Sequence, residues 1–141
     1  MANVKFNSFG KAIAKNDMDT VTIKAMFCDP AYTPDPDTEV YLSDVVAHRA
    51  SGSTDLTVAG LAFNVDNTDN RTEFDINDLV TGAITIAGGT DGIVFYIDTG
   101  VESTSELLTY NDILVSAVKT TVYPIAGTLT GTISANGIFS I

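Results

Sequence analysis

The feature that most constrains the fold is the apolar run at residues 93–97, inside the stretch DGIVFYIDTG. Five consecutive apolar residues are too few to cross a membrane. They are also rich in β-branched and aromatic side chains, which favour strands, and glycines on both sides indicate turns. The run therefore predicts a strand that is buried on both faces, in the middle of a sheet.

The segments around this run alternate between apolar and polar residues, which indicates weaker, half-buried strands. Residues 20–27 show the alternation most clearly. Residues 61–65 and 72–76 alternate on either side of the polar turn at 66–70, and so predict a hairpin. Further strands are expected near residues 84–86, 107–110, 113–118, 128–135 and 138–141.

About eight short strands at spacings of roughly eight to twelve residues predict an all-β fold. No helical crossover separates consecutive strands, so the pairing should be antiparallel. We expect a β-sandwich or a jelly-roll-like barrel, formed by a single domain over residues 17–141. Residues 29–37 hold three of the four prolines and indicate a surface loop, whereas residues 39–46 fit either a short helix or a strand. The expected core includes Phe74, Ile76, Phe95 and Ile97.

Residues 1–16 form an N-terminal arm or short helix ahead of this domain. Phe6, Phe9 and Ile13 recur at helical spacing, with lysines on the opposite side. Two interpretations are open: the helix packs on its own domain, or it is an arm that docks on a partner. The apolar end of the chain is a second candidate for docking, and its residues are Ile138, Phe139 and Ile141.

The charge is strongly negative and unevenly distributed. Eighteen acidic and seven basic residues give a net charge of -11, and no acid occurs before residue 17. An acidic surface repels phosphate groups, so no nucleic-acid partner is expected. No apolar stretch has the length of a membrane span or of a signal peptide, and Cys28 is the only cysteine. We therefore expect a chain that is made in a reducing cytoplasm and has no membrane partner.

No residue pattern predicts an active site. His48 is the only histidine, and it lacks the neighbours of a zinc site or a catalytic triad. Residues 66–77 resemble a calcium loop only superficially, because Arg71 replaces the required glycine and Asn77 the bidentate glutamate. The expected protein is not an enzyme, and it has no catalytic residues, no cofactor and no metal ion.

Four motifs, in the same order along the chain, resemble those of a family of small virion proteins from tailed bacteriophages. The first is TVTIKAMFCDPAYTPDPDTEVYLSDV, with a TIK-type strand, an AYTPD loop and an SDV segment. The second is NTDNRTEFDINDLV, which is similar to an N-x-R-x-x-FDA-x-D-V hairpin. The third and fourth are IVFYIDTG, similar to AVIYKDTG, and the closing GTISANGIFSI. Ile97 replaces the lysine of the third motif, and the second continues into Thr81-Gly82 rather than an aromatic residue.

The resemblance is to capsid decoration proteins, also called cement or head-stabilising proteins. It implies a β-rich homotrimer on the outer surface of the phage head, bound to the major capsid protein. Phe6, Phe9, Ile13, Ile138, Phe139 and Ile141 would then contact the capsid or a neighbouring subunit. Two alternatives are a structural or adaptor protein of the tail or fibre, and a receptor- or carbohydrate-binding β module. The scattered tyrosines and the absence of tryptophan argue against the binding module.

Overall fold

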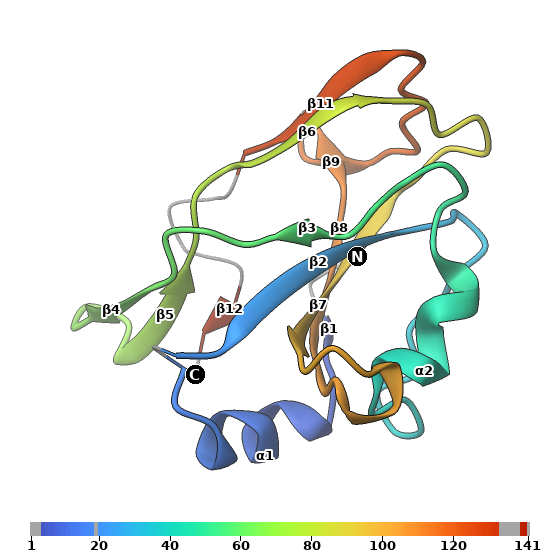
Figure 1. The fold of residues 1–141 in the computed structure, drawn as a ribbon. Coiled ribbons are helices and arrows are strands. Elements are labelled where there is room, and N and C mark those ends of the chain that lie inside the picture. Colours follow the sequence, from blue (N-terminus) through green and yellow to red (C-terminus); the bar gives the residue numbers. More distant parts are fainter. Residues whose placement is uncertain (1–3, 19, 133–138, 141) are drawn as a thin grey trace.

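The computed structural model describes residues 4–18, 20–132 and 139–140 of the 141-residue chain. The protein is mostly β, with antiparallel sheets and a short N-terminal helix, as the sequence predicts (Figure 1). The main sheet has five strands in the order β1-β8-β7-β2-β3. Their bounds are Val4–Lys5 for β1, Leu107–Asp112 for β8, Gly92–Asp98 for β7, Thr22–Cys28 for β2 and Leu56–Thr57 for β3.

The predicted central strand is confirmed as β7, which lies in the middle of the main sheet. It pairs with β2 along its whole length, from Gly92 opposite Cys28 to Asp98 opposite Thr22, and with β8 on its other side. Side chains alternate between the two faces of a strand, and each face of β7 enters a separate apolar cluster. One cluster receives Ile93, Phe95 and Ile97, and the other receives Val94 and Tyr96.

Three smaller antiparallel sheets surround the main one. They are β12-β5-β4, β11-β6 and β10-β9. Within the part of the chain that the structure describes, the sheets do not close into a barrel. Their strands are β4 (Ala62–Asp66), β5 (Arg71–Asp75), β6 (Leu79–Ile84), β9 (Leu114–Val115), β10 (Val118–Lys119), β11 (Gly127–Gly131) and β12 (Phe139–Ser140).

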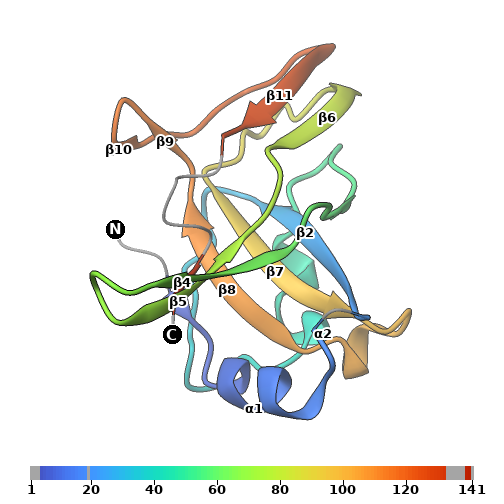
Figure 2. The same ribbon diagram turned by 90° about the vertical axis from the view of Figure 1, so that its left-hand side faces the viewer.

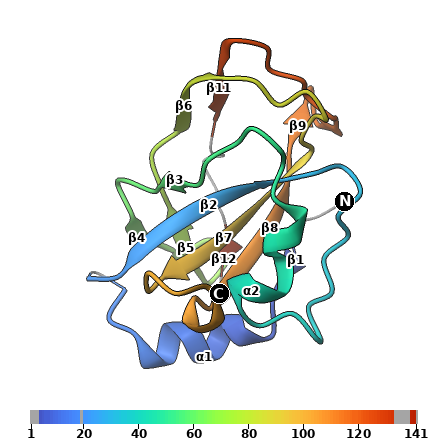
Figure 3. The same ribbon diagram turned by 45° about the vertical axis from the view of Figure 1, so that its right-hand side comes forward.

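Two short helices contribute side chains to the two apolar clusters, and α1 lies across one end of the main sheet (Figure 1). Helix α1 (Ser8–Lys15) places Phe9 in the cluster of Phe95, whereas α2 (Leu42–Val45) places Leu42 and Val45 in the cluster of Tyr96 (Figure 3). Residues 39–46, whose sequence fits either a short helix or a strand, therefore contain a helix. This helix continues into a 3-10 turn (Val46–His48). A second 3-10 turn, Glu102–Thr104, follows β7.

The predicted hairpin is confirmed as β4 and β5, with Phe63 opposite Phe74. Phe74 and Ile76 are buried as expected, and Phe74 contacts Phe9 of α1 edge to face. The alternating apolar residues of β4 behave differently, because Phe63 and Val65 are exposed. The edge position of β4 explains the difference: its outer neighbours are solvent rather than core.

Candidate docking surface

The N-terminal residues that the sequence proposes for docking are packed inside the domain. Phe6 is 1% exposed and Phe9 is 5% exposed, and they enter the two apolar clusters on opposite faces of the main sheet. Ile13 is partly buried against the cluster that contains Phe9. Of the two interpretations of this helix, the structure shows the one in which it packs on its own domain. Phe6 and Phe9 are therefore buried in the chain on its own, and the contact role of Phe6, Phe9 and Ile13 stays a prediction.

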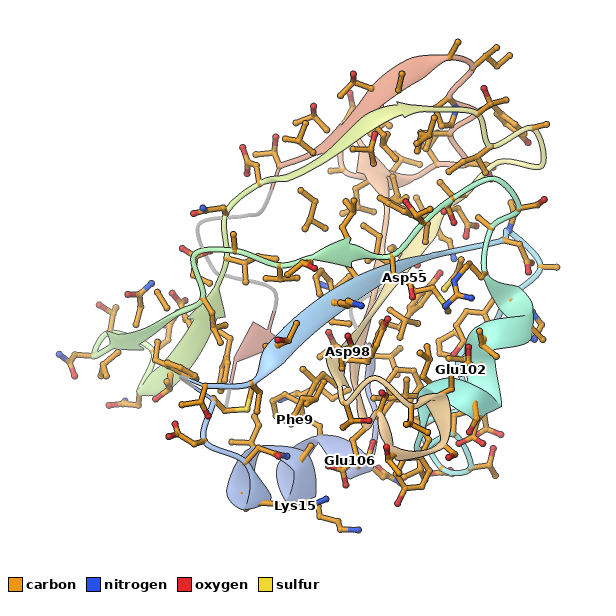
Figure 4. All side chains as sticks on the ribbon, in the orientation of Figure 1. Phe9, Lys15, Asp55, Asp98, Glu102 and Glu106 are labelled. Atoms are coloured by element: carbon orange, nitrogen blue, oxygen red, sulfur yellow. The ribbon has the colours of Figure 1, made fainter. Side chains whose placement is uncertain are left out.

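The N-terminal segment is held to strand β8 along its length. Strand β1 pairs with β8, and the Ser8 hydroxyl donates to the carbonyl of Leu107 at 2.9 Å. The amines of Lys11 and Lys15 lie 4.0 and 3.7 Å from a carboxylate oxygen of Glu106, which is almost fully buried (Figure 4). These two lysines thus lie close to a buried acid of their own chain.

The C-terminal candidates are described only in part. Phe139 lies in β12 and pairs with Phe74 of β5, so this strand joins a sheet of its own domain. Ile138 and Ile141 lie outside the described residues, and their contact role stays a prediction.

A different surface becomes visible once the strands are placed. Residues 79–90 and 113–132 come together at one end of the molecule, where β6, β9, β10 and β11 lie (Figures 1 and 2). We call this part the uncharged lobe, because Lys119 is its only charged residue. The rest of the chain carries the eighteen acids and the six other basic residues.

Large apolar side chains are exposed on this lobe. They come from β6, from the β9–β10 hairpin and from the segment between β10 and β11. Elsewhere in the described residues, such side chains are exposed only on β4 and beside the Glu102–Thr104 turn. The exposed apolar residues of the lobe are Val80, Leu114, Val115, Val118, Tyr123 and Ile125.

The lobe is an ordered extension of the domain. Strands β6 and β11 pair from Leu79 opposite Gly131 to Ile84 opposite Gly127, with an irregularity between Thr128 and Thr130. At that irregularity the amide of Leu129 donates to the Thr81 hydroxyl at 2.9 Å, which replaces a ladder bond. Leu79 and Ile86 are buried in the core cluster of Phe95, and this attaches the lobe to the body.

Lys119 connects the hairpin of the lobe to the main sheet. Its amine lies 3.0 Å from Asp112 Oδ1 and 3.4 Å from Asp91 Oδ2, and it donates to the Tyr110 hydroxyl at 3.0 Å. Burial by itself lowers the pKa of Lys119, but the bonds to Tyr110 and Asp112 outweigh burial and raise it. The one charged side chain of the lobe is therefore paired within its own chain, and it is not available to a partner.

Gly92 makes room for this anchor. A Cβ atom at residue 92 would lie 2.1 Å from the Tyr110 hydroxyl oxygen, far inside van der Waals contact. Glycine at this position therefore lets the Tyr110 ring lie against the start of β7, with its hydroxyl aimed at Lys119.

A second polar cluster is formed by Arg49, Asp55 and Tyr96. Arg49 donates from Nε and Nη2 to the two carboxylate oxygens of Asp55 at 2.8 Å each, and the Tyr96 hydroxyl donates to the same carboxylate at 2.7 Å. Burial and the Asp55 carboxylate raise the pKa of Tyr96, so its hydroxyl keeps its proton. The two-pronged Arg–carboxylate pair and the tyrosine hold the loop of residues 49–55 on the main sheet.

His48 is half-exposed, with Nδ1 3.4 Å from Asp29 Oδ2 and its ring against Tyr32. Among the described residues, no group of three or more histidine, cysteine or acidic side chains could hold a metal ion. No described helix is long and apolar enough to cross a membrane. The expectations of no metal, no cofactor and no catalytic residue stay predictions.

No protein-family model, curated protein or solved structure matches this chain. The uncharged lobe, which the structure reveals, has a signal in the sequence. The chain has twenty-five charged residues, and only one of them lies in residues 79–90 and 113–132. Sequence reasoning missed the lobe because the pairing of β6 with β11, far apart along the chain, is what brings the two uncharged segments together.

Proposed function

We propose that this chain is a structural virion protein, a decoration protein that binds the outer surface of a tailed-phage head and stabilises it. Its partners would be the major capsid protein and further copies of itself, as a homotrimer. The observation that carries the proposal is the uncharged lobe: an acidic domain presents its exposed apolar side chains mainly on one ordered extension whose single charge, Lys119, is paired within the chain. Such a surface is suited to permanent assembly rather than to turnover of a substrate.

The body of the domain supports the same role. Strand β7 is buried on both faces, and the smaller β12-β5-β4 sheet contributes Phe74 to the core on one side of the main sheet. We interpret this as sandwich-type packing, which gives a stiff body. A protein that braces a pressurised shell needs stiffness and buried contact area, because it resists expansion by contact alone.

The direct test is the binding of the purified chain to heads of a tailed phage that encodes it, prepared without the chain. We expect saturable binding in co-sedimentation, label on the head surface in electron micrographs, and release of DNA at a higher temperature once the heads are decorated. Binding to isolated tails but not to heads would favour the adaptor alternative. Binding to neither would contradict a structural role in the virion.

A further inference from the structure

We propose that the uncharged lobe is the surface on which a second copy of this chain packs. This deepens the proposed function, because it assigns one of the two proposed partners to a named surface. It requires no phage head, however, since the copies would meet in solution.

The distribution of charge favours the lobe as the contact between two copies. Outside it, eighteen acids oppose six basic residues, so two copies that approach through their bodies repel each other. Inside it, the only charge is Lys119, and that amine is held by Asp112, Asp91 and Tyr110 of its own chain. The lobe is therefore the part of the molecule where two copies can touch without bringing like charges together.

The lobe also has strand edges and apolar side chains that a partner could cover. Its sheets have two strands each, β11-β6 and β10-β9, in which Leu79, Ile84 and Leu129 pack against the core, whereas Val80, Leu114 and Val115 are exposed. Within the described residues, each of these strands pairs on one side only. A neighbouring copy could bury the apolar side chains around Val80 and Ile125, and it could continue the ladder at an open edge.

Charge complementarity disfavours a charged partner at this surface. A basic partner would gain most from the acidic body, and an acidic partner would find no available cation on the lobe. A second copy presents an equally uncharged apolar lobe. A contact between the lobes of two copies therefore leaves no charge without a partner.

The test is the molecular mass of the chain of residues 1–141, measured by sedimentation velocity over a wide range of concentration. We expect an assembly larger than the 14.9 kDa of one chain. Added salt should strengthen the association, because it screens repulsion between the acidic bodies, whereas a contact made by ion pairs would weaken. A chain that sediments as a single copy at every concentration and salt level would overturn the proposal.

Two substitutions to aspartate test whether the lobe is the contact between copies. Val80→Asp lies in β6 at 55% exposure and Ile125→Asp lies between β10 and β11 at 76%, so neither should disturb folding. Each buries an unpaired charge in the contact and should weaken association by about a hundredfold or more. Circular dichroism of each variant checks that the domain is folded.

The matched controls lie on the acidic body. Val101→Asp changes a valine with the same 55% exposure, beside the Glu102–Thr104 turn, and Val65→Asp changes a valine of β4 with 71% exposure. Both should associate as the unchanged chain does. If the two lobe variants associate normally, or if only Val65→Asp dissociates, the lobe is not the contact between copies. Head binding by a chain that stays single would leave the proposed function standing and remove this inference alone.

Discussion

At the scale of single residues, Lys119 joins the hairpin of the lobe to the main sheet. It is partly exposed, yet it faces the carboxylate of Asp112, which is 1% exposed, and the hydroxyl of Tyr110. Burial by itself raises the pKa of Asp112, but the net shift is downward, and the ammonium of Lys119 is one of its causes. The lysine thus helps to keep a buried carboxylate ionised while it fixes the hairpin of the lobe.

We predict that Lys119→Met lowers the free energy of unfolding by about 2–4 kcal/mol at neutral pH, because it removes a partner of buried carboxylates. A group whose pKa is lowered in the folded state stabilises the protein above its ordinary pKa, and this contribution is lost as the pH falls. The deficit of the variant should therefore be constant above about pH 5 and should shrink between about pH 5 and pH 3.

Urea melts of both proteins at the two pH values measure this deficit. Lys15→Met is the matched control, because its amine is largely exposed and lies 3.7 Å from Glu106; it should cost less than about 1 kcal/mol. Equal losses for the two variants, or a Lys119→Met deficit that is independent of pH, would contradict the anchor.

At the scale of elements, the N-terminal segment belongs to the domain. Strand β1 pairs with β8, and α1 contributes Phe9 and Ala12 to the core. The amphipathic spacing of Phe6, Phe9 and Ile13 predicted the helix but not its partner. A helix that packs on its own sheet and one that docks on another protein bury the same kind of face, so the pattern alone cannot separate them.

We predict that deletion of residues 1–16 abolishes cooperative unfolding, because it exposes both apolar clusters. Phe9→Ala, a milder change, should lower the free energy of unfolding by about 3–5 kcal/mol. Lys11→Ala, on the exposed side of the same helix, should lie within about 1 kcal/mol of the unchanged protein. Thermal melts followed by circular dichroism measure all three. A truncated chain that melts cooperatively near the original temperature would show that the segment is a free arm.

At the scale of the whole molecule, the sequence predicted what local patterns encode. The β7 run, the β4–β5 hairpin and the antiparallel β-rich class follow from periodicity and turn residues. The exposure of Phe63 and Val65 could not be predicted, because an alternating strand at a sheet edge looks like one over the core. The lobe was missed for a related reason, since it is formed by long-range pairing of β6 with β11.

The uncharged lobe is the surface that we propose this protein buries when it assembles. Hydrogen exchange of the backbone amides, compared between dilute and concentrated chain and again on decorated heads, tests this proposal most directly. We predict that protection rises in residues 79–84 and 113–131 on concentration and is kept on the heads, while the β4–β5 hairpin stays unchanged. Protection that rises in residues 62–75 or around α2, with none gained in the lobe, would contradict the account.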